Sequence, residues 1–185
     1  GHIHRTTTYV EMLARELKKR GLCSDELTED YIKNLVMAAP MHDIGKIAIP
    51  DAILQKPGKL TAEEYEVMKT HSAKGGEIIE GTFKTIGDDE YSRIAYQVAR
   101  YHHERWNGSG YPDGLLRKEI PLSARIMAVA DVFDAVSANR CYRDAMPLEK
   151  CFKIIENGSG HDFDPMIAEV FLDMRDEIAA IVNNQ

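Results

Sequence analysis

Seven histidine and aspartate side chains stand in or beside apolar, helical-looking segments of the sequence. They are His2, His42, Asp43, His71, His102, His103 and Asp131. A buried imidazole or carboxylate is costly unless it is paired or binds a metal ion. The set offers nitrogen and oxygen atoms but no thiolate, so it suits Fe, Mn, Ni or Zn better than Ca or Mg. Seven ligands exceed the needs of one ion and match two ions that share a carboxylate, a site that can activate water and hold the oxygens of a phosphoester.

Taken one at a time, these residues also have structural interpretations. A histidine on an apolar helix is commonly a hydrogen-bonded core residue. Asp131 could instead pair with Arg125 or Arg140. His102 and His103 could form a helix end exposed to water, where the helix dipole favours a cation. The residue types alone leave both interpretations open.

The elements that must position these residues are helices. Apolar residues recur at helical spacing, and sustained alternation typical of strands is nearly absent. Thr61 to Glu64 read as a capping box at the start of one helix. The polar, Gly-rich segment 107–114 is expected to be a loop. We therefore predict an all-α domain of about seven helices: one ending near Gly21, then 28–41, 61–79, 89–103, 123–139, one from Pro147 and one over 165–181.

Length and composition narrow the function classes. The 185 residues fit one domain, and 44% hydrophobic residues suffice for a core. With 23 basic and 30 acidic residues the net charge is 23 − 30 = −7, which argues against binding a nucleic-acid polymer. No apolar stretch is long enough for a membrane span, and no signal peptide is visible, so we expect a cytoplasmic protein. The three cysteines are expected to be reduced packing residues.

A series of motifs, in one order along the chain, resembles the HD-GYP subfamily of the HD phosphohydrolase superfamily. Residues 42–46 read HDIGK, and residues 102–112 read HHERWNGSGYP, against the subfamily pattern HHExxDGxGYP. Residues 140–143 match its R-x-Y-R stretch, and residues 163–165 its terminal FDP. The resemblance covers essentially the whole chain.

This resemblance implies an HD-domain helical bundle with a long GYP loop, and a metal-dependent phosphodiesterase of bacterial second-messenger signalling. Its substrate would be cyclic di-GMP, opened to pGpG and on to GMP; some members act on cyclic GMP–AMP. Residues 1–185 would form one HD-GYP domain, the C-terminal part of a larger chain with an upstream receiver or sensory domain. Signalling-protein partners and a homodimer are further expectations.

The resemblance also assigns roles to the seven ligand candidates. His42, Asp43 and Asp131 would hold the first metal, with His2 nearby. Asp43 would bridge to a second metal held by His71, His102 and His103. The metals would be Fe, Mn or Ni, with Zn as an alternative. Members with three metals carry a Glu four residues before the first-helix histidine, a position that would precede Gly1, so a third metal stays open.

Other residues would act on the substrate. Lys46, one turn after Asp43, would direct its ammonium group at the scissile phosphate or the attacking water. Arg140 and Arg143 would hold phosphate or guanine through planar, bidentate contacts. Tyr111 would shape the mouth of the pocket. Asp134, one turn after Asp131, would orient a ligand histidine or the water.

Two substitutions depart from the family pattern. Asn107 replaces an aspartate, for which we expect an indirect effect rather than loss of activity. Arg117 stands where glycine is common and adds positive charge beside the loop.

Two rival functions remain at this stage. The fold could bind a cyclic dinucleotide, or dock onto signalling proteins, without hydrolysis. Alternatively, the enzyme could act on cyclic GMP–AMP, linear pGpG or a nucleoside monophosphate.

Overall fold

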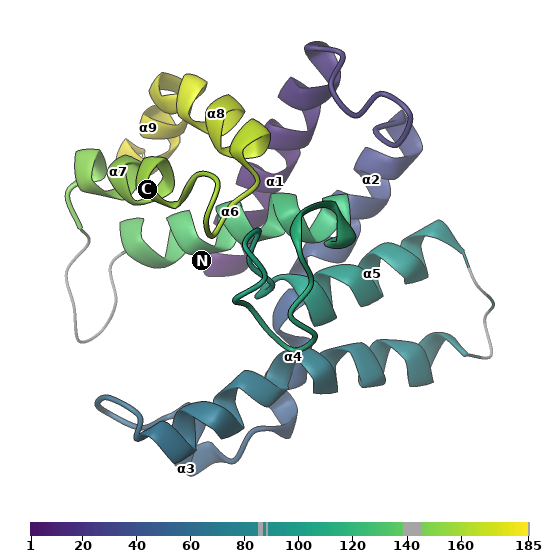
Figure 1. The fold of residues 1–185 in the computed structure, drawn as a ribbon, viewed down its shortest axis with the longest axis vertical. Helices are drawn as coiled ribbons and strands as arrows, with labels where there is room; N and C mark the ends of the chain where they lie inside the picture. Colours follow the sequence, from purple (N-terminus) through teal and green to yellow (C-terminus); the bar gives the residue numbers. More distant parts are fainter. Residues whose placement is uncertain (85–86, 88, 139–145, 185) are drawn as a thin grey trace.

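The computed structural model describes residues 1–84, 87, 89–138 and 146–184 (Figure 1). Within these residues the chain forms nine α-helices and two 3-10 helices. Regular β structure is limited there to the isolated bridges Asn107–Leu116 and Ser159–Phe163. The prediction of an all-α fold is therefore confirmed.

The elements follow one another along the chain with short connections. They are α1 His2–Lys19, α2 Glu29–Ala38, the 3-10 helix η1 Ala39–Ala48, α3 Asp51–Leu54, α4 Ala62–Phe83, α5 Glu90–Tyr101, the 3-10 helix η2 Arg117–Glu119, α6 Leu122–Ser137, α7 Leu148–Gly158, α8 Pro165–Asp173 and α9 Arg175–Asn183.

This helix count exceeds the predicted seven for two local reasons. The short helix α3 lies inside a segment expected to be a loop, and the predicted helix 165–181 is broken at Met174 into α8 and α9. The predicted helix 28–41 also ends early, at Ala38, and continues as η1. Pro40 lacks the N–H that the next α-helical hydrogen bond needs, so a change of winding at this point is expected.

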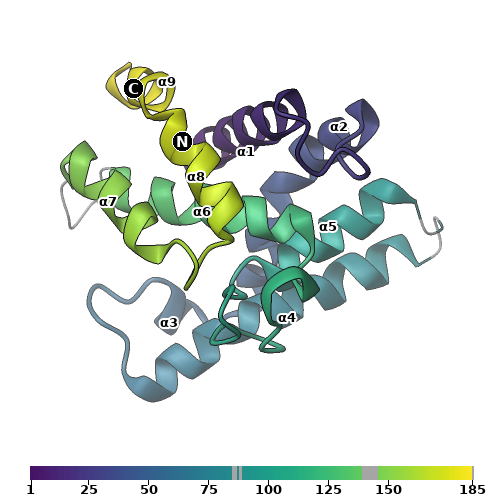
Figure 2. The ribbon, with the colours of Figure 1, turned by 45° about the horizontal axis from the view of Figure 1, so that its top comes forward.

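Helix α6 crosses the middle of the molecule, and α1, α5, α7 and α8 pack against it (Figures 1 and 2). Its side chains are apolar on nearly every face, as is typical of a helix surrounded by others. Ile126, Val129 and Phe133 are fully buried. The helix therefore carries Asp134 into the interior, and Asp131 to a partly buried position beside it. Among the described residues, no helix combines the length and apolar character needed to cross a membrane.

Helices α4 and α5 lie side by side, and η1 packs against both (Figure 2). The approach of η1 to α4 is a contact between backbones. A Cβ atom at Gly45 would lie 1.8 Å from the carbonyl oxygen of His71 and 2.6 Å from the amide nitrogen of Gly75. Only glycine fits at position 45, so the glycine of the HDIGK motif sets how closely its own histidine and aspartate approach α4.

Polar side chains fix the helix ends. Thr61 and Glu64 form the predicted capping box of α4. Asp164 accepts a hydrogen bond from the amide of Met166 at the start of α8, and its other oxygen lies 2.7 Å from Nη1 of the buried Arg125. The alternative in which Arg125 pairs with Asp131 is therefore wrong, because Arg125 instead ties α6 to α8.

Candidate metal centre

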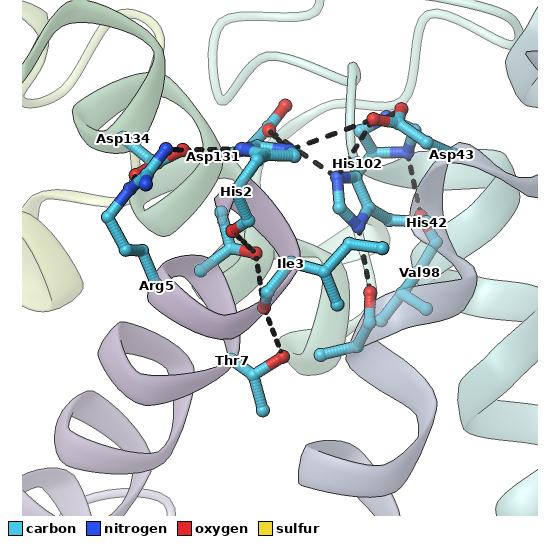
Figure 3. Close-up of polar contacts among 12 residues, drawn as sticks. His2, Ile3, Arg5, Thr7, His42, Asp43, Val98, His102, Asp131 and Asp134 are labelled. Carbon is cyan, nitrogen blue, oxygen red and sulfur yellow. Dashed lines mark hydrogen bonds and ion pairs between the residues drawn. The ribbon is translucent and has the colours of Figure 1, made fainter. Parts of the chain in front are cut away.

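The seven predicted ligand residues come together at one place. Figure 3 labels His2, His42, Asp43, His102 and Asp131 there. They reach it from α1, η1, α4, the end of α5 and α6. His102 is the C-cap of α5 and is only 1% exposed, so the interpretation of this histidine as part of a helix end in water is wrong. Long-range packing, rather than proximity in sequence, assembles the cluster.

The cluster divides into two groups of three. The mixed trio consists of His2, His42 and Asp131, and the imidazole trio of His71, His102 and His103. Within each trio the candidate ligand atoms all lie within 4.8 Å of one another. Each trio is thus compact enough to surround a single ion.

Asp43 lies between the two trios. Its Oδ2 is 3.2 Å from Nε2 of His42 and 3.8 Å from Nε2 of His2. Its Oδ1 is 3.6 Å from Nε2 of His71 and 3.7 Å from Nε2 of His102. One carboxylate oxygen therefore faces each trio, the arrangement a bridging carboxylate requires.

The buried histidines are oriented by backbone carbonyls. Nδ1 of His42 lies 2.8 Å from the carbonyl oxygen of Ala39, Nδ1 of His71 lies 2.7 Å from that of Met68, and Nδ1 of His102 lies 2.7 Å from that of Val98. A carbonyl only accepts, so Nδ1 donates in each ring, and Nε2 is the nitrogen that presents a lone pair when the ring is neutral.

In the described part of the chain, these three buried Nε2 atoms have no hydrogen-bond partner. A buried polar atom without a partner requires an explanation. Imidazole nitrogens that converge beside two carboxylates are suited to binding divalent metal ions. The residues present therefore fit a metal site.

The electrostatics differ between the trios. Burial alone would lower the pKa of His42, but contacts with Asp131 and Asp43 outweigh it and raise the pKa to about 10. Burial and the neighbouring His102 and His71 instead lower the pKa of His103 to about 2. The mixed trio therefore favours a positive charge, whereas His103 stays neutral, the form in which imidazole binds a metal.

The carboxylates of the cluster are held ionised. Burial would raise the pKa of Asp43, but contacts with His102 and His42 hold it well below its usual value. The same competition, with His42 as the main partner, lowers the pKa of Asp131. Both aspartates therefore offer a negative charge to a cation.

A further carboxylate supports the mixed trio from behind. Asp134 is fully buried, and its oxygens contact Nδ1 of His2 and Nε of Arg5 (Figure 3). The predicted contact of Asp134 with a ligand histidine is thus observed. Sequence reasoning missed Arg5, although its position three residues after His2 on one helix was an available signal.

Lys46 and Tyr111 both lie at the cavity beside the cluster. Nζ of Lys46 is 3.2 Å from Oδ2 of Asp43, and the Tyr111 ring stacks on His103 with ring centres 4.9 Å apart. Both line a cavity of about 600 Å³ that also exposes His2, Asp43, His71, His103 and Asp131. Arg140 and Arg143 lie outside the described residues.

The cavity has neighbours that sequence reasoning did not single out, among them Tyr65 and Arg105. A larger cavity of about 990 Å³ lies between α4 and α5, lined by Phe83, Tyr96 and other residues. It includes none of the seven ligand candidates. The chemistry of the lining, and not the volume, therefore marks the site.

The buried side chain of Glu104 binds the backbone of the GYP loop, the segment 107–114 and the residue after it. No role was predicted for Glu104 from the sequence. This side chain is 2% exposed and accepts hydrogen bonds from the backbone amides of Asp113, Gly114 and Leu115. Because three amides bind one buried carboxylate, the loop is fixed relative to the preceding histidines.

The two departures from the family pattern have local roles in this loop. Asn107 accepts hydrogen bonds from the amide and hydroxyl of Ser109. Arg117 has a φ of +53°, in the left-handed region that favours glycine. This conformation explains why glycine is common at that position.

Known proteins are similar to this chain in sequence and in fold. The family described as HD domain matches residues 2–167. A cyclic di-GMP phosphodiesterase of Vibrio cholerae is 45% identical over 97% of the chain and 37% of its own length. A 3'3'-cGAMP-specific phosphodiesterase of the same species is 42% identical over 97% of the chain and 32% of its own length. The chain thus spans about a third of the length of these relatives.

The comparison of folds agrees. The crystal structure of a cyclic GMP-AMP specific phosphodiesterase of V. cholerae superposes with a TM-score of 0.67 at 19% identity, covering 98% of the chain and 45% of that structure. The chain belongs to the HD domain family. Divalent metal binding is a property of this family, and the His and Asp groups described above are present to provide it.

Proposed function

We propose that this chain is a metal-dependent phosphodiesterase domain that hydrolyses cyclic di-GMP to pGpG, and on to GMP. The observation that carries the proposal is the position of Asp43, with one oxygen facing each of two compact ligand trios. The names of relatives at 45% and 42% identity support the substrate class.

The residues divide between two metals as the geometry suggests. The mixed trio with Oδ2 of Asp43 would hold one ion, and the imidazole trio with Oδ1 the other. When bound, such ions lower the pKa of water and neutralise charge on phosphoryl oxygens. Nitrogen and carboxylate donors suit Fe, Mn or Ni, with Zn as an alternative.

The side chains at the open face would position the substrate. Lys46 places an ammonium group beside Asp43, where it can stabilise charge that develops on the phosphoryl oxygens. Tyr111, stacked on His103, offers an aromatic surface at the cavity wall to a nucleobase. Asp134 holds the ring of His2 by accepting from Nδ1, so that Nε2 faces the cluster.

The direct test measures metal content and cyclic di-GMP hydrolysis on the same sample. We expect close to two metals per chain and the appearance of pGpG or GMP. Asp43→Asn removes the charge that both trios face, so metal and activity should be lost together. His161→Ala, at an exposed histidine outside the cluster, is the matched control and should retain both. An active Asp43→Asn protein without metal would overturn the proposal.

Cyclic GMP–AMP is a second candidate substrate, because a relative named as specific for it is 42% identical to this chain. Product analysis on cyclic di-GMP, cyclic GMP–AMP and pGpG would rank the three. Metal-loaded protein that binds these nucleotides but cuts none of them would favour the non-hydrolytic binding module. The upstream domain, the cytoplasmic location, protein partners and the homodimer stay predictions.

A further inference from the structure

The cavity beside the candidate metal centre has an aromatic wall, to which Tyr65 contributes as well as Tyr111. We define it as Tyr65 and Tyr111, both of which line the cavity. Nζ of Lys69 lies 5.5 Å from the ring centre of Tyr65 and 5.6 Å from that of Tyr111. Flat rings with a cation between them form a surface on which bases can stack.

The cations that line this cavity differ in whether they already have a partner. Arg5 is paired with the buried Asp134, and Lys46 with Asp43. Arg105 also lines the cavity, but its guanidinium makes no hydrogen bond or ion pair with any residue in the described part of the chain. It is only partly exposed. Among the described residues that line the cavity, Arg105 is therefore the arginine or lysine that remains available to an anion.

The backbone at Arg105 is fixed on both sides. The preceding Glu104 is buried and binds the amides of Asp113 and Gly114. The amide of the following Trp106 donates to the carbonyl of Asp162 at 3.2 Å. Gly110 packs so closely against the backbone of this segment that a Cβ atom at Gly110 would lie 2.4 Å from the backbone amide nitrogen of Arg105. A side chain anchored in this way loses less conformational entropy on binding than one on a free loop.

We propose that Arg105 binds the second phosphate of the cyclic dinucleotide, the one that is not being cut. This inference rests on the proposed function. A cyclic dinucleotide carries two phosphodiester groups, and the one to be cut must lie at Asp43 and Lys46. The other phosphate then needs a cation elsewhere in the same cavity, and guanidinium matches two phosphate oxygens bidentately.

The test compares two ligands with the same bases but different phosphate counts. Cyclic di-GMP has two phosphodiester groups, whereas linear GpG has one. In Arg105→Gln we expect the KM for cyclic di-GMP to rise about 10- to 100-fold, the usual cost of losing a charged hydrogen bond. The kcat should change by less than about 3-fold, and the inhibition constant of GpG, measured as a competitor of cyclic di-GMP hydrolysis, should stay the same.

Three further measurements distinguish a specific contact with phosphate from a general effect of the substitution. Arg15→Gln, at an exposed arginine of α1 remote from the cavity, is the matched control and should leave every constant unchanged. Arg105→Lys should restore part of the lost affinity, because it returns the charge without the bidentate geometry. Thermal melting and metal content should match the wild type, since the Arg105 side chain makes no hydrogen bond or ion pair with any described residue and is not one of the seven ligand candidates.

The outcomes separate the two proposals. Equal weakening of cyclic di-GMP and GpG would mean that Arg105 contacts a base or shapes the loop, and would overturn this inference alone. Unchanged kinetics in Arg105→Gln would also overturn it alone. A wild-type protein that fails to cut cyclic di-GMP would overturn the proposed function, and this inference with it.

Discussion

The two ligand trios resemble each other in size but differ in charge and in what supports them. The mixed trio contains the carboxylate of Asp131 and is supported by a second carboxylate, Asp134, which is itself paired with Arg5. The imidazole trio contains no carboxylate, and the rings of His71 and His102 are supported by backbone carbonyls. Among the described residues, Asp43 is the carboxylate whose two oxygens face the two trios.

This difference has a consequence for metal binding. A carboxylate ligand adds a full negative charge that attracts a divalent cation, and a neutral imidazole does not. We therefore expect the mixed trio to hold its ion more tightly, and the imidazole trio to depend more on Asp43. Changes that touch one trio, both trios or neither should give different patterns of metal content and activity.

The largest effect is expected at the contact that joins the trios. In Gly45→Ala the new methyl group would lie 1.8 Å from the His71 carbonyl oxygen, so η1 and α4 must move apart. We expect the free energy of unfolding to fall by about 3 kcal/mol or more, which is at the upper end for overpacked sites. Both metals should be lost. Urea unfolding and elemental analysis would measure these effects.

The matched control for that substitution is Gly81→Ala, also in α4. A Cβ at Gly81 meets no atom within 4 Å, so this change should be neutral or should stabilise the helix by up to about 1 kcal/mol. If Gly45→Ala and Gly81→Ala were equally stable, the close backbone contact at Gly45 would not be what holds η1 against α4.

A smaller effect, on rate alone, is expected at Lys46. Its ammonium lies beside the shared Asp43 but belongs to neither trio. Lys46→Met should leave both metals in place and lower kcat about 10²-fold, as for the loss of one positioned charge donor. Lys59→Met, at an exposed lysine, is the control. Loss of metal from Lys46→Met would instead make Lys46 part of the metal-binding structure.

The smallest effect, confined to one trio, is expected at Asp134. Asp134→Asn removes the charged acceptor of His2 Nδ1. The affinity of the mixed trio for its metal ion should therefore fall about 10- to 100-fold. The ion at the imidazole trio should be unaffected. Calorimetric titration with Mn²⁺ would measure both sites, with Asp176→Asn on α9 as the control. Equal weakening at both sites would contradict the division into two separately supported trios.

Local pattern was sufficient to predict much of this molecule. Helical spacing and capping residues such as Thr61 and Asp164 identified most helices, because these signals act within a few residues. The seven ligand candidates could be selected because ionisable side chains in apolar helices need a partner. The resemblance to HD-GYP proteins then added a function class that matches the family.

The local signals failed where distant segments meet. The break at Met174 and the winding of η1 depend on packing around them, and the pairing of Arg125 with Asp164 joins residues 39 positions apart. The contact of His2 with Asp134 spans 132 positions. Neither partner carries a local mark of the other, so no spacing rule could connect them.

The sequence by itself determined the kinds of ligand, the helices that carry them and the loop that follows His103. Those properties come from side-chain chemistry and short-range backbone geometry. The resemblance already implied two groups of ligands joined by Asp43. Only the tertiary structure put one oxygen of Asp43 toward each trio and, among the described residues, left the Arg105 side chain beside the cavity without a hydrogen bond or ion pair. These depend on how α1, η1, α4, α5 and α6 pack, because packing joins segments that are far apart in the sequence, as at the close contact of Gly45 with α4.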